Sequence, residues 1–175
     1  MKIDTKESLF ITYSNVRRNF EIRNYVSQCG SWVNKKISEE PILFHWLSLL
    51  QKDLFIEINK IVKITKNGEL KGFIGKAIDE FNNPDKEKLK QFFFENENML
   101  FIQKINNSRN KYYAHLDPDY QDYIKPYYQH DLELLLLEIE KTIIAIYGKK
   151  ELIVYLSKIP SSKDYNFFEK YFLNK

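Results

Sequence analysis

The sequence predicts an all-α protein, an up-and-down bundle of five to seven helices forming a single domain over residues 1–175. Three observations favour this fold class. Only five Gly and five Pro occur in 175 residues, so residues that break helices are scarce. Apolar residues recur at spacings of three and four along most of the chain. Hydrophobic residues make up 43% and charged residues 29%, which is typical of a globular chain and excludes wholesale disorder.

The first two helices are predicted from their apolar stripes and end signals. Lys6–Cys29 carries apolar residues at helical spacing, and Gly30 is well placed to end that helix. Ser38 then precedes two acids and Pro41, which is the composition of a helix start. The apolar stripe over Ile42–Leu54 is broad, so we expect this second helix to be central and largely buried.

The stretch after Leu54 is ambiguous. Ile56 and Ile58 alternate with polar residues, and Asn67-Gly68 is a strong signal for a hairpin turn. Short apolar runs cannot be assigned from periodicity alone. We favour a continuing helix, a loop at Asn67-Gly68 and a short helix over Leu70–Phe81, with a β-hairpin as the alternative.

Two further helices are predicted before a long connection. Asn83-Pro84-Asp85 supplies an N-cap, a proline for the first helical position and an acid. The next helix follows Asn96 and should end near His115, because Pro118 disfavours helical geometry in the residue before it. The connection over 117–128 is long for a compact domain, and loops of that length are usually functional or disordered.

The C-terminal third contains the clearest helix. It opens at Asp131, keeps one apolar stripe as far as Ile146 and closes at Gly148. Short helices are expected over Leu152–Leu156 and Asp164–Leu173.

Several classes of protein are excluded or disfavoured by composition. The single cysteine, Cys29, cannot form an internal disulfide, and three His residues without ligand spacing predict no metal or other cofactor. His45 lies within the apolar stripe of the second helix, so we expect it in the core or at an interface, and His130 marks the start of the following helix. The first residues lack the apolar run of a signal peptide, and no stretch approaches eighteen uncharged apolar residues. We therefore expect a cytoplasmic protein without a membrane partner. The net charge of +3 is compatible with an anionic partner but is weak evidence for one.

One short segment carries side chains suited to catalysis. It reads RNKYYAHLD, begins at Arg109 and lies where a helix should end and the long connection should begin. An Arg binds phosphate through a planar pair of N–H donors, and a His exchanges protons near neutral pH. With Asn110 to orient the phosphate or the imidazole, Arg109 and His115 meet the needs of phosphodiester cleavage without a metal ion.

These nine residues resemble the signature of the HEPN superfamily, in which an Arg is followed at once by a polar residue and four to six residues later by a His. The added Lys, Ala-His and Asp resemble the branch related to AbiU-type abortive-infection proteins. The resemblance implies an all-α bundle that forms a homodimer, with the motif facing a cleft between the subunits. It also implies metal-independent cleavage of an RNA substrate in toxin–antitoxin or phage-defence systems, where an antitoxin protein is a possible partner. Carried over by position, Arg109, Asn110 and His115 are the catalytic candidates.

Two more residues of the motif are predicted to bind substrate. Lys111 supplies a positive charge for phosphate, and Tyr112 supplies a ring for stacking on a base. For Tyr112 the alternative is core packing, since the chain contains 12 Tyr.

Three functions remain open from the sequence. The first is an endoribonuclease, the second a non-catalytic HEPN module that binds nucleic acid or a protein, and the third a helical interaction protein. In the third, Arg109 is a solvated charge and His115 a cation at a helix C-terminus. Six residues separate them, or about 240 degrees on an ideal helix. They converge only if His115 lies past the helix end or if two subunits combine.

Overall fold

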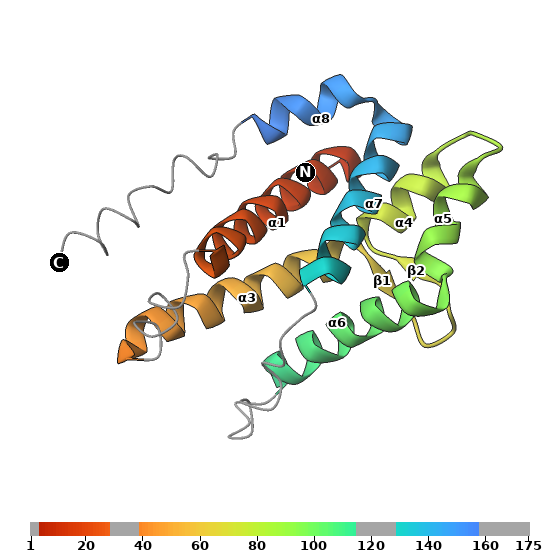
Figure 1. Ribbon diagram of the computed structural model, residues 1–175. Helices are drawn as coiled ribbons and strands as arrows, with labels where there is room; N and C mark the ends of the chain where they lie inside the picture. Colours follow the sequence, from red (N-terminus) through yellow and green to blue (C-terminus); the bar gives the residue numbers. More distant parts are fainter. Residues whose placement is uncertain (1–3, 29–38, 115–128, 158–175) are drawn as a thin grey trace.

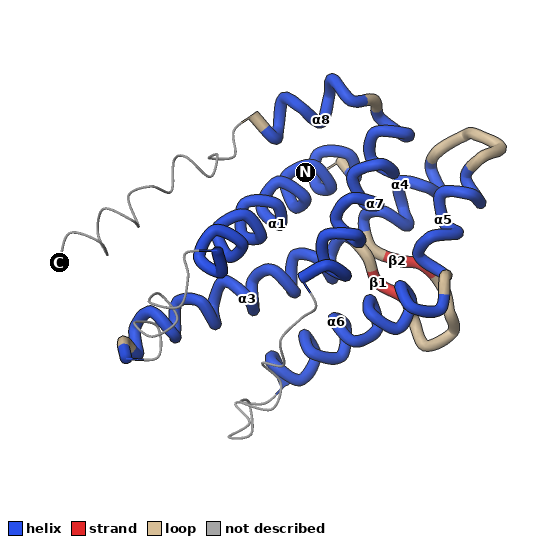
Figure 2. The backbone as a smooth tube through the Cα atoms, in the orientation of Figure 1, coloured by secondary structure: helices blue, strands red, loops and turns tan. Residues whose placement is uncertain are grey.

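The computed structural model of the chain describes residues 4–28, 39–114 and 129–157 (Figure 1). Over these ranges the chain forms seven helices and one two-stranded hairpin (Figure 2). In chain order they are α1 (Thr5–Gln28), α3 (Pro41–Ile61), β1 (Lys63–Ile64), β2 (Leu70–Lys71), α4 (Phe73–Glu80), α5 (Lys86–Phe94), α6 (Asn96–Ala114), α7 (Gln129–Tyr147) and α8 (Lys149–Leu156). The predicted all-α bundle is confirmed.

The long helices α1, α3 and α6 form one layer, and the other elements pack against it. α3 lies between α1 and α6, and the three helices alternate in direction (Figure 1). α7 packs against α4 and leads into α8, which returns over α1. α6 therefore packs against α3, although the two helices are separated in sequence by the hairpin, α4 and α5.

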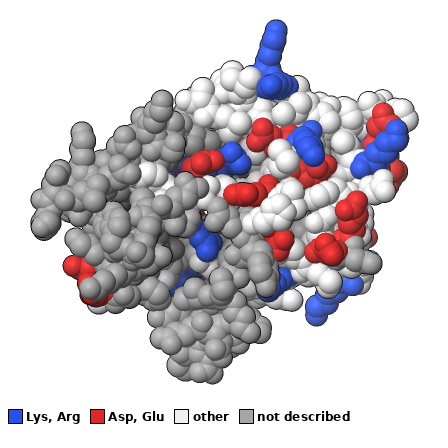
Figure 3. All heavy atoms as spheres, viewed as in Figure 1, with Lys and Arg blue, Asp and Glu red and all other residues white. Residues whose placement is uncertain are grey.

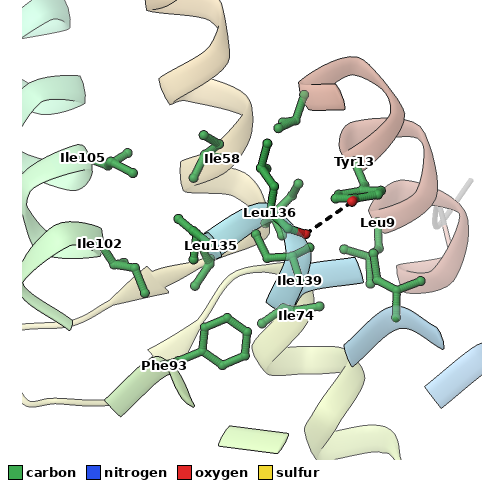
Figure 4. Close-up of a cluster of buried hydrophobic side chains, with 14 of the residues drawn as sticks. Leu9, Tyr13, Ile58, Ile74, Phe93, Ile102, Ile105, Leu135, Leu136 and Ile139 are labelled. Atoms are coloured by element: carbon green, nitrogen blue, oxygen red, sulfur yellow. Dashed lines mark hydrogen bonds between the residues drawn. The ribbon is translucent and has the colours of Figure 1, made fainter. Parts of the chain in front are cut away.

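The core is one cluster to which all the helices contribute (Figure 4). Its largest fully buried side chains are Tyr13, Phe10, Phe55, Phe93, Leu9, Leu54, Ile58, Ile61, Ile74, Ile78, Ile102 and Ile105. The predicted stripe of α7 supplies five more, which are Leu132, Leu135, Leu136, Ile139 and Ile143. Full burial of one such aliphatic or aromatic side chain contributes roughly 1.5–3 kcal/mol, so this cluster stabilises the bundle.

The region after α3 corrects the sequence prediction. α3 continues to Ile61, as expected, but β1 and β2 then pair as an antiparallel hairpin with Ile64 opposite Leu70. The hairpin was the alternative, and the helix expected from Leu70 begins only at Phe73. Gly68 takes a φ of +76 in the five-residue connection 65–69, a conformation that favours glycine and suits a hairpin loop.

A second glycine joins the hairpin to α4. Gly72 has a φ of +91, and a Cβ atom added to it would lie 2.5 Å from the carbonyl oxygen of Ile61. Only a residue without a side chain lets the end of β2 pass this close to the end of α3. This requirement explains why α4 starts after Gly72 rather than at Leu70.

Of the other boundaries, the end of α7 follows its predicted signal, whereas the N-cap of α5 is Asp85, two residues later than the predicted Asn83. The side chain of Asn83 accepts a hydrogen bond from the backbone N–H of Asp85 at 2.8 Å, so it organises a turn, and α5 begins at Lys86. Gly148, with a φ of +89, ends α7. The helix expected over 164–173 and the connection over 117–128 lie outside the described residues.

Candidate functional site

The C-terminal half of α6 positions the first residue of the motif. Ile105 and Asn106 are buried on the side of α6 that packs against α3 and β1. Arg109 follows them by four and three residues, so it lies on the same face of the helix, one turn further along. Its half-buried position agrees with that placement. The α3-facing side of α6 therefore carries a cationic side chain one turn beyond Asn106.

Asn106 anchors this part of α6 through two hydrogen bonds. Its side-chain oxygen accepts a bond from the amide of Asn59 on α3. Its own amide donates to the backbone carbonyl of Ile64 on β1 at 3.4 Å. Asn106 is 6% exposed, and a buried amide is tolerated because its donors and acceptors are paired. Below, Asn59 and Asn106 together are called the asparagine pair.

The remaining motif residues are described only in part. The backbone at Asn110, Lys111 and Tyr112 continues α6, while the side chains of these residues lie outside the described part of the chain. His115 also lies outside the described residues, so its convergence with Arg109 remains a prediction. Position 111 is about 200 degrees around an ideal helix from position 109.

Gln51 is a buried polar residue of α3 that was not identified from the sequence. Gln51 is 8% exposed, and its Nε2 has no hydrogen-bond partner within the described part of the chain. The signal for it was present, because Gln51 lies four residues before Phe55 and seven before Ile58 on the apolar stripe. A polar residue at such a position is informative, since burying an unpaired amide costs free energy.

The histidines of the described residues lie at the surface. His45, expected in the core or at an interface, is exposed in the first half of α3, so the core interpretation is wrong. His130 is exposed in the first turn of α7, as its predicted place at a helix start implies. Neither contributes to the inward face of α6.

The described side chain whose pKa is shifted most by burial is Tyr13, on α1. Tyr13 is fully buried, and its hydroxyl donates to Glu140 at 2.7 Å and lies 3.3 Å from the carbonyl oxygen of Leu136. Burial raises the pKa of Tyr13 above its usual range, and the hydrogen bond to Glu140 raises it further. This phenol stays protonated and joins α1 to α7.

Neither positive nor negative charge dominates the described part of the surface that Figure 3 shows. Basic and acidic side chains alternate over the face seen in Figure 3. Within residues 4–28, 39–114 and 129–157, no group of three His, Cys, Asp or Glu side chains is arranged to hold a metal ion. Nor is any helix in those ranges long and apolar enough to span a membrane.

Comparisons with known proteins add no relative. No family model, curated protein or solved structure matches the chain. The functional argument therefore depends on the motif and on the geometry of α6.

Proposed function

We propose that the chain is a metal-independent endoribonuclease of the HEPN type that acts in a toxin–antitoxin or phage-defence system. The observation that carries the proposal is the position of Arg109. It is half-buried on the inward face of α6, in the last turns before the segment that contains His115. A guanidinium held there can bind a phosphate with its planar pair of donors.

The proposed chemistry uses the RNA's own hydroxyl as the nucleophile. The 2′-oxygen attacks the adjacent phosphorus, and the bond from phosphorus to the 5′-oxygen of the next nucleotide breaks. His115 removes the proton from the 2′-hydroxyl or delivers one to the leaving oxygen, Asn110 orients the phosphate or the imidazole, and Arg109 neutralises the charge that develops on phosphorus. Lys111 and Tyr112 are proposed to hold the substrate. The products are a 2′,3′-cyclic phosphate and a 5′-hydroxyl.

A homodimer is proposed as the active form. The 240-degree separation of positions 109 and 115 on an ideal helix is most simply overcome when two motifs face one another. A monomer by light scattering at tens of micromolar, where a stable interface should persist, would contradict this part of the proposal.

The central experiment compares the wild-type chain with His115→Ala and Arg109→Ala in RNA binding and RNA cleavage. His115→Ala should reduce cleavage by roughly 10²- to 10⁴-fold and leave binding nearly intact, because proton transfer acts on the rate. Arg109→Ala should weaken both, and Arg109→Lys should restore them incompletely because lysine lacks the planar fork. Arg18→Ala is the matched control, since Arg18 is exposed and also precedes an Asn, but on α1.

The outcomes separate the three functions. Cleavage should persist in a chelator and stop when deoxyribose replaces the ribose at the cleaved position, while binding continues. Cleavage by His115→Ala at the wild-type rate would refute the catalytic role of that residue. Binding without cleavage by the wild type would replace the enzyme with a binding module, and the absence of both would leave an interaction protein.

A further inference from the structure

The asparagine pair is placed to fix the position of Arg109. Asn59 comes from α3, Asn106 from α6 and the third partner, the carbonyl of Ile64, from β1. Asn106 thus bonds to two different elements one turn before Arg109. A helix held by apolar contacts alone can slide or rotate by small steps at little cost, whereas hydrogen bonds in two directions restrict both movements.

Of the two amides, Asn106 is buried and Asn59 half-buried, and the advantage of joining helices through such groups is specificity. An amide contributes less apolar burial than a leucine, and both of its polar ends must be paired. In packed helices a buried Asn sets register and orientation at the expense of stability. Here the pair sets which turn of α6 lies beside Asn59, and through this it sets where Arg109 extends from the helix.

We infer that Asn59 and Asn106 are positioning residues for Arg109, which hold its guanidinium at the phosphate-binding position. The inference rests on the proposed ribonuclease function and adds two residues to it. Neither asparagine needs to touch RNA. Their effect is expected to be large because a displacement of about 1 Å in a positioned group can reduce a rate by roughly 100-fold.

The test uses three leucine variants, Asn59→Leu, Asn106→Leu and the double variant. Asn59→Leu leaves the buried amide of Asn106 without its partner, Asn106→Leu leaves the half-buried amide of Asn59 without its partner, and both variants should have a lower melting temperature. The double variant replaces both amides by apolar side chains, so part of the stability should return. Positioning predicts that RNA cleavage, measured per folded molecule, remains reduced by roughly 10- to 100-fold in all three variants.

Asn19→Leu is the matched control. Asn19 is 4% exposed and donates to Asp53 at 2.5 Å, so it is also a buried Asn that joins α3 to another helix, in this case α1. Its loss should lower stability while cleavage per folded molecule stays within about twofold of the wild type, since α6 is untouched.

A binding measurement tests the same inference without cleavage. The affinity for single-stranded RNA should fall with salt, and each phosphate contact contributes about 0.7 to the logarithmic slope. If the pair positions Arg109, the Asn106→Leu and Arg109→Ala variants should lose a similar part of that slope, and combining them should lose no more. A purely structural role would leave the slope of Asn106→Leu at the wild-type value.

Each outcome decides between the two ideas. Suppose that cleavage by the wild type depends on Arg109 and that the double leucine variant cleaves at the wild-type rate. This result overturns the positioning role of the asparagine pair and leaves the proposed function standing. An equal loss of activity in Asn19→Leu also overturns it, because the effect is then general. If the wild type neither binds nor cleaves RNA, the proposed function fails and the inference fails with it.

Discussion

The contact between α1 and α7 and the contact between α3 and α6 each contain a buried polar side chain, but they use it differently. Tyr13 brings a large ring into the core (Figure 4), and its hydroxyl donates a hydrogen bond to Glu140. The asparagine pair brings little apolar area, and its hydrogen bonds reach three elements. Burial of the ring stabilises the fold, whereas the amides mainly select one arrangement of α6. The end of the bundle that carries the motif is therefore held by orientation more than by apolar area.

The largest effect is expected at Tyr13. Tyr13→Ala removes a fully buried ring and leaves the Glu140 carboxylate without its donor, so the free energy of unfolding should fall by about 3–5 kcal/mol. Chemical denaturation measures this loss. Ile11→Ala is the control, because Ile11 is 47% exposed on the same helix and should cost far less. Comparable losses at the two positions would mean that the ring is not a main support of the bundle.

A smaller loss is expected at the asparagine pair. Asn106→Ala leaves the amide of Asn59 and the carbonyl of Ile64 without their partner, which should reduce the free energy of unfolding by about 1–3 kcal/mol. The neighbouring Asn107 is exposed, so Asn107→Ala should change it by no more than about 0.5 kcal/mol. A loss at Asn106 as large as that at Tyr13 would remove the contrast between the two contacts.

The raised pKa of Tyr13 predicts a pH dependence with a definite sign. An unfolded chain loses the phenol proton near pH 10, whereas the native state keeps it to higher pH. The native state then binds more protons, so its stability is complete below pH 10 and falls above it by about 1.4 kcal/mol per pH unit. Denaturation at several alkaline pH values should show a shallower decline in Tyr13→Phe, and identical slopes would show that Tyr13 does not contribute.

Substitution of Gln51 should change the free energy of unfolding least, and it should raise it rather than lower it. Its Nε2 is buried without a partner among the described residues, so Gln51→Leu should raise the free energy of unfolding by about 1 kcal/mol. Gln91→Leu on the exposed side of α5 should leave it nearly unchanged. A clear loss of stability in Gln51→Leu would mean that the amide has a bonding role in the native state.

The elements that could be predicted from the sequence are those whose period and ends are determined by neighbouring residues. The apolar periodicities of α3 and α7 and the glycine at the end of α7 were sufficient, because helix period and helix end depend on neighbouring residues. The hairpin was harder, since two-residue strands are too short to show an alternating pattern. Its true signals were Asn67-Gly68 and the tight passage at Gly72, and the second becomes visible only when α3 and β2 are brought together.

In the candidate site too, features set by neighbouring residues could be predicted and features set by distant contacts could not. Arg109 could be singled out from the motif, and helical spacing placed it on the face of Ile105. The asparagine pair could not be predicted, because Asn59 and Asn106 are 47 residues apart and meet only through the antiparallel packing of two helices. His45 was misplaced for a related reason. An apolar stripe shows which residues share a helix face but not whether another element covers them.

The hydrogen bond between Tyr13 and the backbone of Leu136 spans 123 residues, which has a consequence for the chain during its synthesis. A ribosome adds about 5–20 residues per second, so Tyr13 is synthesised roughly 6–25 seconds before Leu136. During that interval the apolar side of α1 has α3 as its first partner and lacks α7 and α8. The nascent chain therefore exposes apolar surface of α1, to which chaperones and neighbouring nascent chains can bind, until its last third emerges from the exit tunnel.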